Sequence, residues 1–393
     1  MIGGGAAGFF TAVNLKAMCP QMDVTIFERS SRVLAKVAVS GGGRCNVTNT
    51  FEGVTDLSSV YPRGHRLMKR LMKGFSERDA YEWFESHGVR LTVQDDHCVF
   101  PAAQDARVIV DCLTAEAHRR GVEVLTGTKV GSLAELEDYD FRVVTTGGQP
   151  RGEGLRWLEE CGHETVAPVP SLFTFKTGDA TLHSLMGTVA DDATVAIAGT
   201  RLKARGPLLV THWGMSGPAI LKLSSYAARQ LADGGYRAPL TVNWTSHDDA
   251  AIRAELTRLG RQAPGRQLTA VRPFGLTTRL WTYLAGRALG DRAHAPWDSL
   301  NAKETNRLVN TLANDAYTID GRAPFKDEFV TCGGVALTAV DAATLESRHV
   351  PRLYFAGEVL DIDGVTGGFN FQAAWTTAYT VCKAISVYSY SLE

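Results

Sequence analysis

The order of apolar and polar residues predicts a strand–helix–strand unit at the start of the chain. Met1 and Ile2 lead into a glycine-rich turn, and apolar residues then recur at helical spacing over 9–18, up to Pro20. Residues 23–28, Asp-Val-Thr-Ile-Phe-Glu, follow as a second strand. A helix that connects two strands in this way is typical of a parallel sheet, so the chain begins like an α/β domain.

The pattern changes twice further along. Residues 76–121 look helical with a short strand pair between them. From about 166, short β-like runs predict a barrel or sandwich of modest size, and residues 249–315 are mainly helical and rich in Arg, Leu and Ala. The α/β pattern of the first residues returns after about 328, which suggests that one domain is inserted into another.

Two capping signals predict where helices begin. Ser76 is followed three residues later by Asp79, which is typical of a helix start. Ser216-Gly217-Pro218 opens a second helix, with Ser216 as the N-cap and Pro218 in the first turn. We expect this second helix to continue to the glycine pair at 234–235.

The glycines of the first turn stand in GxGxxG spacing. Gly3 allows a tight turn, Gly5 lets the backbone approach a pyrophosphate, and Gly8 lets helix and strand pack closely. Glu28, at the end of the second strand, is placed to accept hydrogen bonds from ribose hydroxyls, and its charge argues against a 2′-phosphate. The pattern predicts a dinucleotide site, and the alternative is an ordinary glycine turn.

A second glycine-rich region lies near the C-terminus. The apolar run 354–356 ends in Gly357-Glu358, which puts a carboxylate where a strand would meet the sugar chain of a cofactor. A glycine turn at 363–370 then leads into a helical run at 371–385. The N-terminus of that helix would stabilise negative charge on a reduced flavin. Without a ligand, the same glycines would only cap a strand and a helix.

Residues 40–49, SGGGRCNVTN, form a third motif. Three consecutive glycines are costly unless something packs against the bare backbone. Lys36 and Arg44 add cations suited to a phosphate or a flavin carbonyl. Cys45 leaves two interpretations open: a redox thiol that faces the flavin ring, or a small buried residue without chemistry, since the chain has no CxxC pair.

Other catalytic signals are weak. His212, in Thr-His-Trp-Gly-Met-Ser-Gly-Pro at 211–218, is a candidate acid or base near a substrate, but a lone histidine is more often structural. The remaining histidines show no metal-ligand spacing, so we expect no metal site. The chain has no GxSxG nucleophile motif and no P-loop.

Composition narrows the class of protein. With 393 residues the chain has room for two or three domains, and its net charge of -1 gives no footprint for nucleic acid or an anionic membrane, although a local basic patch stays open. Seven cysteines, an odd number, fit reduced thiols. No apolar run approaches the ~18 residues of a membrane span, and no export signal is visible. We expect a cytoplasmic protein without a membrane partner.

Taken together, the motifs resemble a known family. GGGAAG at the start, KVAVSGGGRCNVTN at 36–49, THWGMSGP at 211–218, FKDEFVTCGGV at 325–335 and LYFAGEVLDIDGVTGGFNFQAAW at 353–375 occur in its order. They are similar to the bacterial BaiN/YhiN-type flavoproteins, also described as aminoacetone-oxidase-like FAD enzymes. The resemblance covers essentially the whole chain.

The resemblance implies an α/β fold, with a two-dinucleotide-binding-type FAD domain at 1–167 and 329–393. A β-barrel-like and helical domain would be inserted at 168–328. The family's assigned activities include reduction of steroid double bonds and oxidation of amines, so the substrate does not transfer. By similarity, the following residues would bind FAD: Gly3, Gly5, Ala6, Ala7, Gly8, Glu28, Lys36, Ser40, Gly42, Gly43, Arg44, Cys45, Asn46, Val130, Thr146, Gly147, Gly357, Glu358, Gly367, Gly368, Phe369 and Asn370.

The chain departs from the family pattern in two places. Only Met1 and Ile2 precede the first glycine, where the family has a whole strand, so we expect the first strand to be short or its start to be absent. Residues 131–154 are also fewer than the family pattern calls for. An intact mass that matches 42.5 kDa would argue against missing residues.

These observations predict an FAD-dependent oxidoreductase in which flavin N5 exchanges hydride with a small organic substrate. NAD(P)H or oxygen would be the electron partner, and a single GxGxxG gives no support for a second stable nucleotide site. Two alternatives stay open. One is a flavin-dependent enzyme that modifies nucleic acid, which the near-neutral charge disfavours, and the other is a non-enzymatic flavin redox sensor.

Overall fold

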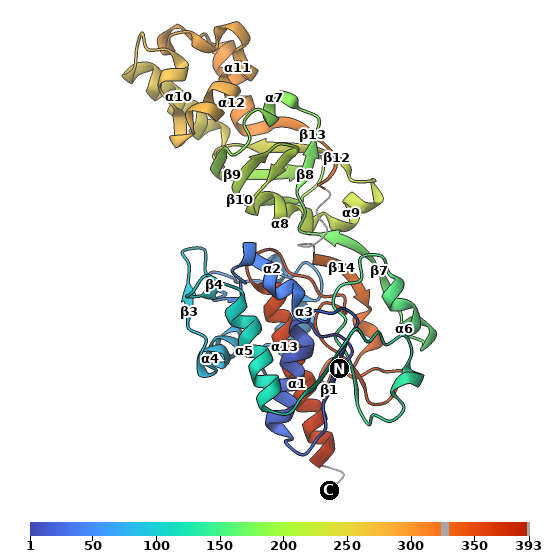
Figure 1. Cartoon of the computed structure of the whole chain (residues 1–393). Helices are drawn as coiled ribbons and strands as arrows, with labels where there is room; N and C mark the ends of the chain where they lie inside the picture. Colours follow the sequence, from blue (N-terminus) through green and yellow to red (C-terminus); the bar gives the residue numbers. More distant parts are fainter. Residues whose placement is uncertain (324–329, 391–393) are drawn as a thin grey trace. The chain divides into compact units, whose positions relative to one another are not determined.

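The computed structural model describes residues 1–323 and 330–390. Its contacts divide the chain into two compact units, coloured along the sequence in Figure 1. Unit 1 combines Met1–Pro170 with the C-terminal part of the chain from Phe325, and unit 2 is Ser171–Pro324. Unit 2 is therefore continuous in sequence and interrupts unit 1.

A parallel sheet forms the centre of unit 1. Its strands are β1 (Thr25–Glu28), β5 (Glu123–Thr126), β6 (Arg142–Val144) and β15 (Leu353–Phe355). β1 pairs in parallel with β5, and β6 pairs in parallel with β15. Between the two pairs, Ile2 bridges Phe27 on one side and Val144 on the other, again in parallel. The short first strand that the sequence predicts is thus the middle of the sheet.

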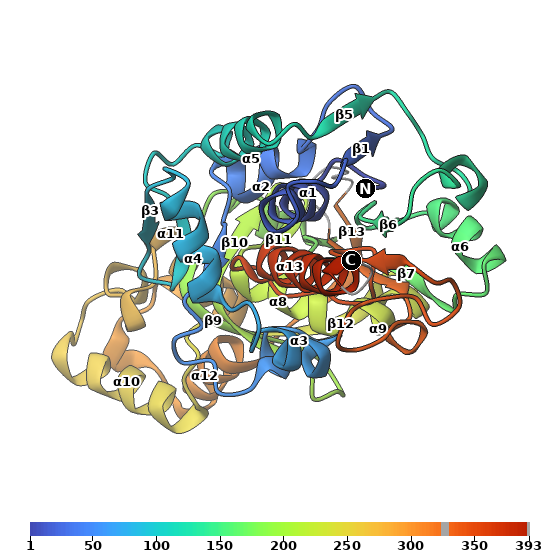
Figure 2. The same ribbon diagram turned by 90° about the horizontal axis from the view of Figure 1, so that it is seen from below.

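Helices α1 (Ala6–Met18) and α13 (Phe369–Tyr390) run side by side, as both overall views show (Figures 1 and 2). α1 is buried over most of its length, so it is an internal helix rather than an amphipathic one. Its buried polar side chains are satisfied within the helix, because Thr11 donates to the carbonyl oxygen of Ala7 and Asn14 to that of Phe10, each at 2.7 Å.

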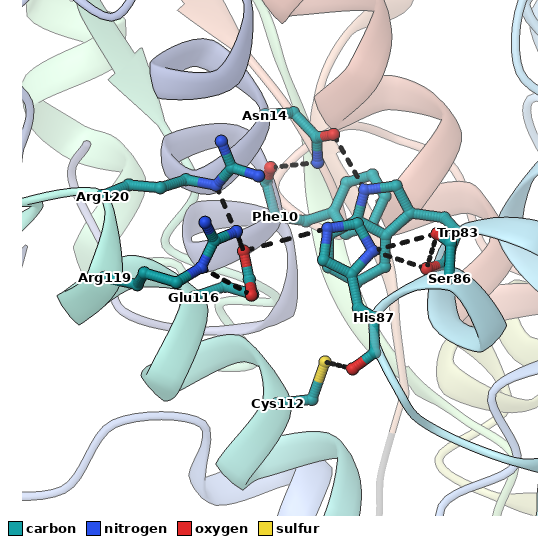
Figure 3. A network of polar contacts seen from close by, with 9 residues as sticks. All are labelled: Phe10, Asn14, Trp83, Ser86, His87, Cys112, Glu116, Arg119 and Arg120. Atoms are coloured by element: carbon teal, nitrogen blue, oxygen red, sulfur yellow. Dashed lines mark hydrogen bonds and ion pairs between the residues drawn. The ribbon is translucent and has the colours of Figure 1, made fainter.

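A polar network ties α1 to α4 (Glu77–Ser86) and α5 (Arg107–Arg119), as Figure 3 shows. The indole N–H of Trp83 donates to Asn14 Oδ1 at 3.0 Å, and the His87 ring stacks on Trp83 with centroids 4.0 Å apart. Glu116 on α5 lies 3.8 Å from His87 Nε2 and also pairs with Arg119. The network holds α1 in place at Asn14, in its C-terminal half, while the glycine turn lies at its N-terminus.

The remaining elements of unit 1 complete its edges. Ser76 and Asp79 form the capping box of α4, which confirms the predicted helix start. β2 and β3 flank β4 in a small antiparallel sheet, and β7 pairs with β14. The bounds are α2 (Ala35–Gly43), β2 (Thr48–Asn49), α3 (His65–Leu71), β3 (Leu91–Val93), β4 (Cys98–Pro101), α6 (Arg156–Glu160), β7 (Thr165–Ser171) and β14 (Val330–Val335).

Unit 2 contains a closed barrel with the strand order β10-β11-β8-β13-β12-β9. Buried and open positions alternate along β9 and β10, as expected for strands with one face toward a core. Its strands are β8 (Phe175–Thr177), β9 (Val189–Ile197), β10 (Lys203–Thr211), β11 (Gly214–Ser216), β12 (Arg237–Asn243) and β13 (Asp315–Arg322). The predicted barrel-like insertion is confirmed.

Helices complete unit 2. They are α7 (Ala180–His183), α8 (Pro218–Tyr226), α9 (Ala228–Asp233), α10 (Asp249–Gln262), α11 (Thr278–Leu289) and α12 (Ala302–Asn314). The last three gather together in Figure 1 and contact one another through α12. None of the helices in the described part of the chain is long and apolar enough to span a bilayer.

The predicted N-cap at Ser216 is wrong. Ser216 is the last residue of β11, and its hydroxyl bonds that of Thr174 at 2.9 Å. Gly217 is the N-cap, with φ of +92°, and a Cβ there would lie 2.7 Å from the carbonyl oxygen of Pro207. The close approach of two backbones therefore decides the helix start. The helix also ends earlier than predicted, at Tyr226, and a second one follows.

Candidate cofactor site

Only glycine fits at the first and third positions of the N-terminal turn. Gly3 has φ of +116°, and a Cβ there would lie 2.5 Å from the carbonyl oxygen of Thr145. A Cβ on Gly8 would lie 2.0 Å from the carbonyl oxygen of Gly3. At Gly5, by contrast, a Cβ would meet no atom within 4 Å. The turn is closed on its protein side and open beside Gly5, where a ligand can approach.

Helix α1 begins beside this opening without a side-chain cap. Gly5 is its N-cap, and the first turn, with Ala6 and Ala7, holds no acidic residue. The unpaired N–H groups of a helix start carry positive potential and suit a phosphate. Gly357, with φ of +79°, packs against the same turn, because a Cβ there would lie 2.8 Å from Ala7 Cβ. The structure thus joins the two glycine motifs from opposite ends of the chain.

The carboxylate of Glu28 is held in place at the end of β1. Oε2 accepts the N–H of Gly4, and Oε1 accepts the N–H and the hydroxyl of Ser30, all at 2.8 Å. Oε2 accepts one hydrogen bond and can accept a second, so a ribose hydroxyl can still bind there. Val130 is half-buried and lies two residues beyond Thr128, whose N–H donates to the backbone oxygen of Glu28 at 2.9 Å.

The three glycines that end α2 form a loop of bare backbone. Gly41, Gly42 and Gly43 have φ of 56°, 67° and 81°, all in the left-handed region. A Cβ on Gly42 or Gly43 would meet no atom within 4 Å. Regular helix geometry stops at Ser40, whose hydroxyl donates to the carbonyl oxygen of Val37 at 2.8 Å. The loop therefore leaves space beside its backbone, as a site for a flat ligand requires.

Two cations lie near these glycines. Arg44 is half-buried, its guanidinium sits 4.4 Å from the ring centroid of Phe100, and its Nε donates to the carbonyl oxygen of Gly41 at 3.3 Å. Lys36 Nζ pairs with Glu358 Oε2 at 2.9 Å, and Glu358 Oε1 accepts the N–H of Thr331 at 2.8 Å. The Lys36 side chain is 55% exposed, so this pair contributes at most about 1 kcal/mol and can open toward a ligand.

Cys45 is fully buried, with φ of +59°. Burial raises the pKa of its thiol to about 12, despite a hydrogen bond from Ser40 that lowers it. The thiol is therefore protonated at neutral pH and is a poor nucleophile. Of the two interpretations, the structure favours the small buried residue.

The glycine loop and the C-terminal glycine turn meet at Gly368. A Cβ on Gly368 would lie 2.3 Å from the carbonyl oxygen of Thr48. With its amide oriented to accept the N–H of Gly368 at 3.1 Å, Asn46 also donates to Thr48 at 2.8 Å. Asn49 Nδ2 donates to the carbonyl oxygen of Gly367 at 3.0 Å. These contacts set the two predicted cofactor loops side by side.

The next two residues shape the turn itself. The Phe369 ring is buried and packs edge-to-face on Phe51, with centroids 5.0 Å apart. The amide of Asn370 accepts the N–H of Gly364 at 2.8 Å and donates to its carbonyl oxygen at 2.9 Å. Both the oxygen and the nitrogen of this amide therefore bond Gly364, so Asn370 stabilises the predicted cofactor loop by holding the turn at 363–370 in shape.

A buried hydroxyl without a partner supports the fit of FAD. Among the described residues, Thr146 Oγ1 has no hydrogen-bond partner. Thr146 follows β6 and lies against the first glycine, because a Cβ on Gly3 would be 3.0 Å from Thr146 Cα. An unsatisfied buried hydroxyl costs about 1–3 kcal/mol, which a cofactor oxygen would offset. Gly147 follows, and a Cβ there would lie 3.9 Å from Glu358 Oε2.

Sequence reasoning missed a buried ion pair that supports the C-terminal turn. Arg63 Nε donates to Asp363 Oδ1 at 2.5 Å, and a second bond joins Arg63 Nη2 to Asp363 Oδ2. Asp363 is fully buried, and burial works to lower the pKa of Arg63, but the bonds and charge of Asp363 outweigh it and raise that pKa. Beside the pair, the Tyr61 hydroxyl donates to the carbonyl oxygen of Phe369 at 2.8 Å.

His212 belongs to unit 2, at the turn between β10 and β11. Its side chain is exposed, and its ring lies 3.8 Å from that of Trp213. The geometry described for unit 2 adds nothing to a catalytic role. In the part of the chain that the structure describes, no group of three His, Cys, Asp or Glu side chains could hold a metal ion.

Comparison with known families agrees with this geometry. The model of the HI0933-like protein Rossmann domain matches residues 1–384. The chain belongs to this family. The resemblance to BaiN/YhiN-type flavoproteins is thereby confirmed, and the protein is an FAD-dependent oxidoreductase with a Rossmann-type domain.

Individual relatives of this HI0933-like protein are distant. The 3-dehydro-bile acid Δ(4,6)-reductase of Clostridium scindens is 26% identical over 409 residues, and 98% of each chain is covered. The ribosomal RNA dihydrouridine synthase of Haemophilus influenzae is 27% identical over 411 residues, also with 98% of each chain covered. The 3-ketosteroid Δ1-dehydrogenase of Sterolibacterium denitrificans is 13% identical, with 98% of each chain covered and a TM-score of 0.49.

Proposed function

We propose that the protein reduces a carbon–carbon double bond conjugated with a carbonyl group in a small organic substrate, with NAD(P)H as the electron donor. The observation that carries this proposal is the contact of Gly357 with Ala7, which brings the two glycine motifs together beside an open helix start. When bound, FAD supplies hydride transfer at N5. The substrate gains that hydride at its β-carbon and a solvent proton at its α-carbon, while NAD(P)H is oxidised to NAD(P)⁺.

The names of two relatives support this class of substrate. A 3-dehydro Δ(4,6) bile acid carries double bonds in conjugation with its ketone. A dihydrouridine synthase saturates the uracil double bond that is conjugated with a ring carbonyl. In both cases the carbonyl oxygen takes up the charge that a hydride brings, so an electron-poor double bond is the shared feature.

The residues of unit 1 would hold and orient the cofactor. Glu28 accepts from ribose hydroxyls, and the first N–H groups of α1 bind the pyrophosphate. Glu358, already fixed by Thr331, accepts from the ribityl chain. The N-terminus of α13 offers positive potential to the ring at the turn that Asn370 braces.

Anaerobic titration of the purified protein tests the proposal. We expect absorption bands at about 370 and 450 nm, as for an oxidised flavin, and bleaching by NADH or NADPH. Cyclohexenone should then restore the bands, whereas cyclohexanone, which lacks the double bond, should not. Bands that neither nucleotide bleaches would point to a sensor, and bands that only oxygen restores would point to an oxidase. A colourless protein that takes up no FAD would contradict the assignment of FAD as the cofactor.

Replacing Cys45 with alanine tests the remaining thiol interpretation. We expect the rate of bleaching by NAD(P)H to stay within about two-fold, because the protonated thiol takes no part in the transfer. Stability should fall by about 1 kcal/mol, since a buried sulfur is removed. Stopped-flow absorbance measures the rate, with Cys112→Ala as a control at a half-buried thiol. A loss of more than about ten-fold at Cys45 alone would restore the redox role.

A second candidate function has its own supporting observation. The residues 171–323 of unit 2 hold 18 Lys and Arg against 12 Asp and Glu, while the rest of the chain holds 23 against 30. The near-neutral total therefore conceals a cationic unit. Together with a relative that acts on ribosomal RNA, this surplus favours a uracil base within RNA as the alternative substrate.

A further inference from the structure

We propose that the helical layer of unit 2, α10 to α12, binds the phosphate backbone of RNA. This inference rests on the second candidate function above and names the surface that would recognise such a substrate. Residues 249–314 hold ten Lys and Arg against five Asp and Glu, so this layer carries most of the positive surplus of unit 2.

Three arginines of α10 to α12 or the turns between them form ion pairs that stabilise unit 2. Arg258 pairs with Glu255, Arg287 with Asp315 and Arg292 with Glu304. Because an ion pair cancels most of the potential of its cation, these three add little to a phosphate surface. Arg272 and Arg279 donate hydrogen bonds to uncharged oxygens, so no carboxylate offsets their charge. These bonds already hold the two side chains in place.

Five other cations are unused. In the parts of the chain that the structure describes, the side chains of Arg253, Arg261, Arg266, Lys303 and Arg307 are exposed and make no hydrogen bond or ion pair. We call these five residues the cationic layer. Arg253 and Arg261 lie on α10, and Lys303 and Arg307 on α12. Of the five, Arg307 interacts electrostatically with Glu304, one helical turn earlier. Exposed cations that no hydrogen bond or ion pair holds are the groups that contact phosphates in nucleic-acid complexes.

A hollow on α12 gives part of this surface a shape. Lys303, Asn306, Arg307 and Asn310 recur at helical spacing on one face, and with parts of α11 they line a hollow of about 410 Å³. No Asp or Glu is among the lining residues. Beside the paired Arg287, which also lines the hollow, Lys303 and Arg307 supply charge. The two amides can donate to phosphate oxygens or to the 2′-hydroxyl, which distinguishes RNA from DNA.

Fluorescence anisotropy with a short uridine-rich single-stranded RNA tests this surface on the FAD-loaded full chain. We expect wild-type affinity to fall with salt, with a slope of about −0.7 for each phosphate contact. The double variant Lys303→Glu, Arg307→Glu should bind at least about ten-fold more weakly and lose about one to two units of slope. Its flavin spectrum and its bleaching by NAD(P)H should match the wild type.

The matched control makes the same charge change on unit 1, with Lys69→Glu and Lys73→Glu, two exposed residues at the end of α3 and in the turn that follows it. It should bind RNA as the wild type does. An equal loss of RNA affinity in both double variants would contradict the proposed RNA surface. So would a wild type that binds no RNA, or one that binds an acidic peptide but not RNA. Intact bleaching without RNA binding leaves the small-molecule function standing. RNA binding without bleaching overturns the reductase proposal and leaves the surface.

Discussion

Replacing Gly8 with alanine is expected to abolish FAD binding and to destabilise the fold. The new Cβ would lie 2.0 Å from the carbonyl oxygen of Gly3 and 2.8 Å from Thr145 Oγ1. The carbonyl belongs to the backbone in the middle of the parallel sheet, so it cannot move without breaking the pairing of Ile2. Overpacking of this kind costs about 1–3 kcal/mol or more. Urea unfolding of the apoprotein and FAD titration measure the two effects.

The same substitution at Gly5 separates cofactor binding from folding. Because a Cβ on Gly5 meets no protein atom within 4 Å and its φ is −90°, Gly5→Ala should leave apoprotein stability within about 0.5 kcal/mol. It should still weaken FAD binding at least about ten-fold, since the methyl group occupies cofactor space. Gly286→Ala, in open space on α11, is the control and should affect neither adversely. Full FAD affinity in Gly5→Ala would place the cofactor elsewhere.

Features set by near neighbours in sequence could be predicted. The GxGxxG turn depends on strand, glycine and helix within eight residues, and the capping box on Ser76 and Asp79 alone. The fold class followed from the pattern and from the family resemblance. The N-cap at Ser216 failed because its competitor, Gly217, is selected by contact with Pro207 on the neighbouring strand, which no local rule includes.

Contacts between distant segments left no signal in the sequence. Arg63 and Asp363 are 300 residues apart, and Tyr61 and Phe369 are 308 apart. Nothing in the local pattern at Arg63 distinguishes it from an ordinary exposed arginine, so its role follows only from the fold. The assignment of the cofactor residues stays a prediction, although the structure brings most of them together in unit 1.

The charge of the chain shows what a total leaves out. The net value of -1 disfavours nucleic acid, and that expectation stays a prediction, but the total adds a cationic unit to an anionic one. An electric potential falls off within about 10 Å at moderate salt, so binding depends on the local sum rather than the total. Counting charges by predicted domain would have found the surplus in the sequence.

Replacing Arg63 with methionine is expected to cost about 3–5 kcal/mol, because it leaves the carboxylate of Asp363 fully buried without a counter-ion. Asp363→Asn should cost less, since the Arg63 side chain is 15% exposed and can reach water. Both variants should weaken FAD binding, because Asp363 precedes the Gly364 turn that Asn370 braces. Urea unfolding gives the stability, and quenching of flavin fluorescence gives the affinity.

The double variant Arg63→Met, Asp363→Leu distinguishes the charge from the packing. If an uncompensated charge is the cause, removing both partners should recover most of the stability lost in Arg63→Met. FAD affinity should recover less, because the backbones of Arg63 and Asp363 form an antiparallel bridge at the turn, and without the ion pair their side chains no longer hold that bridge in place. A loss below about 1 kcal/mol in Arg63→Met would mean that water reaches Asp363, and the turn would then owe its shape to Asn370 and Tyr61.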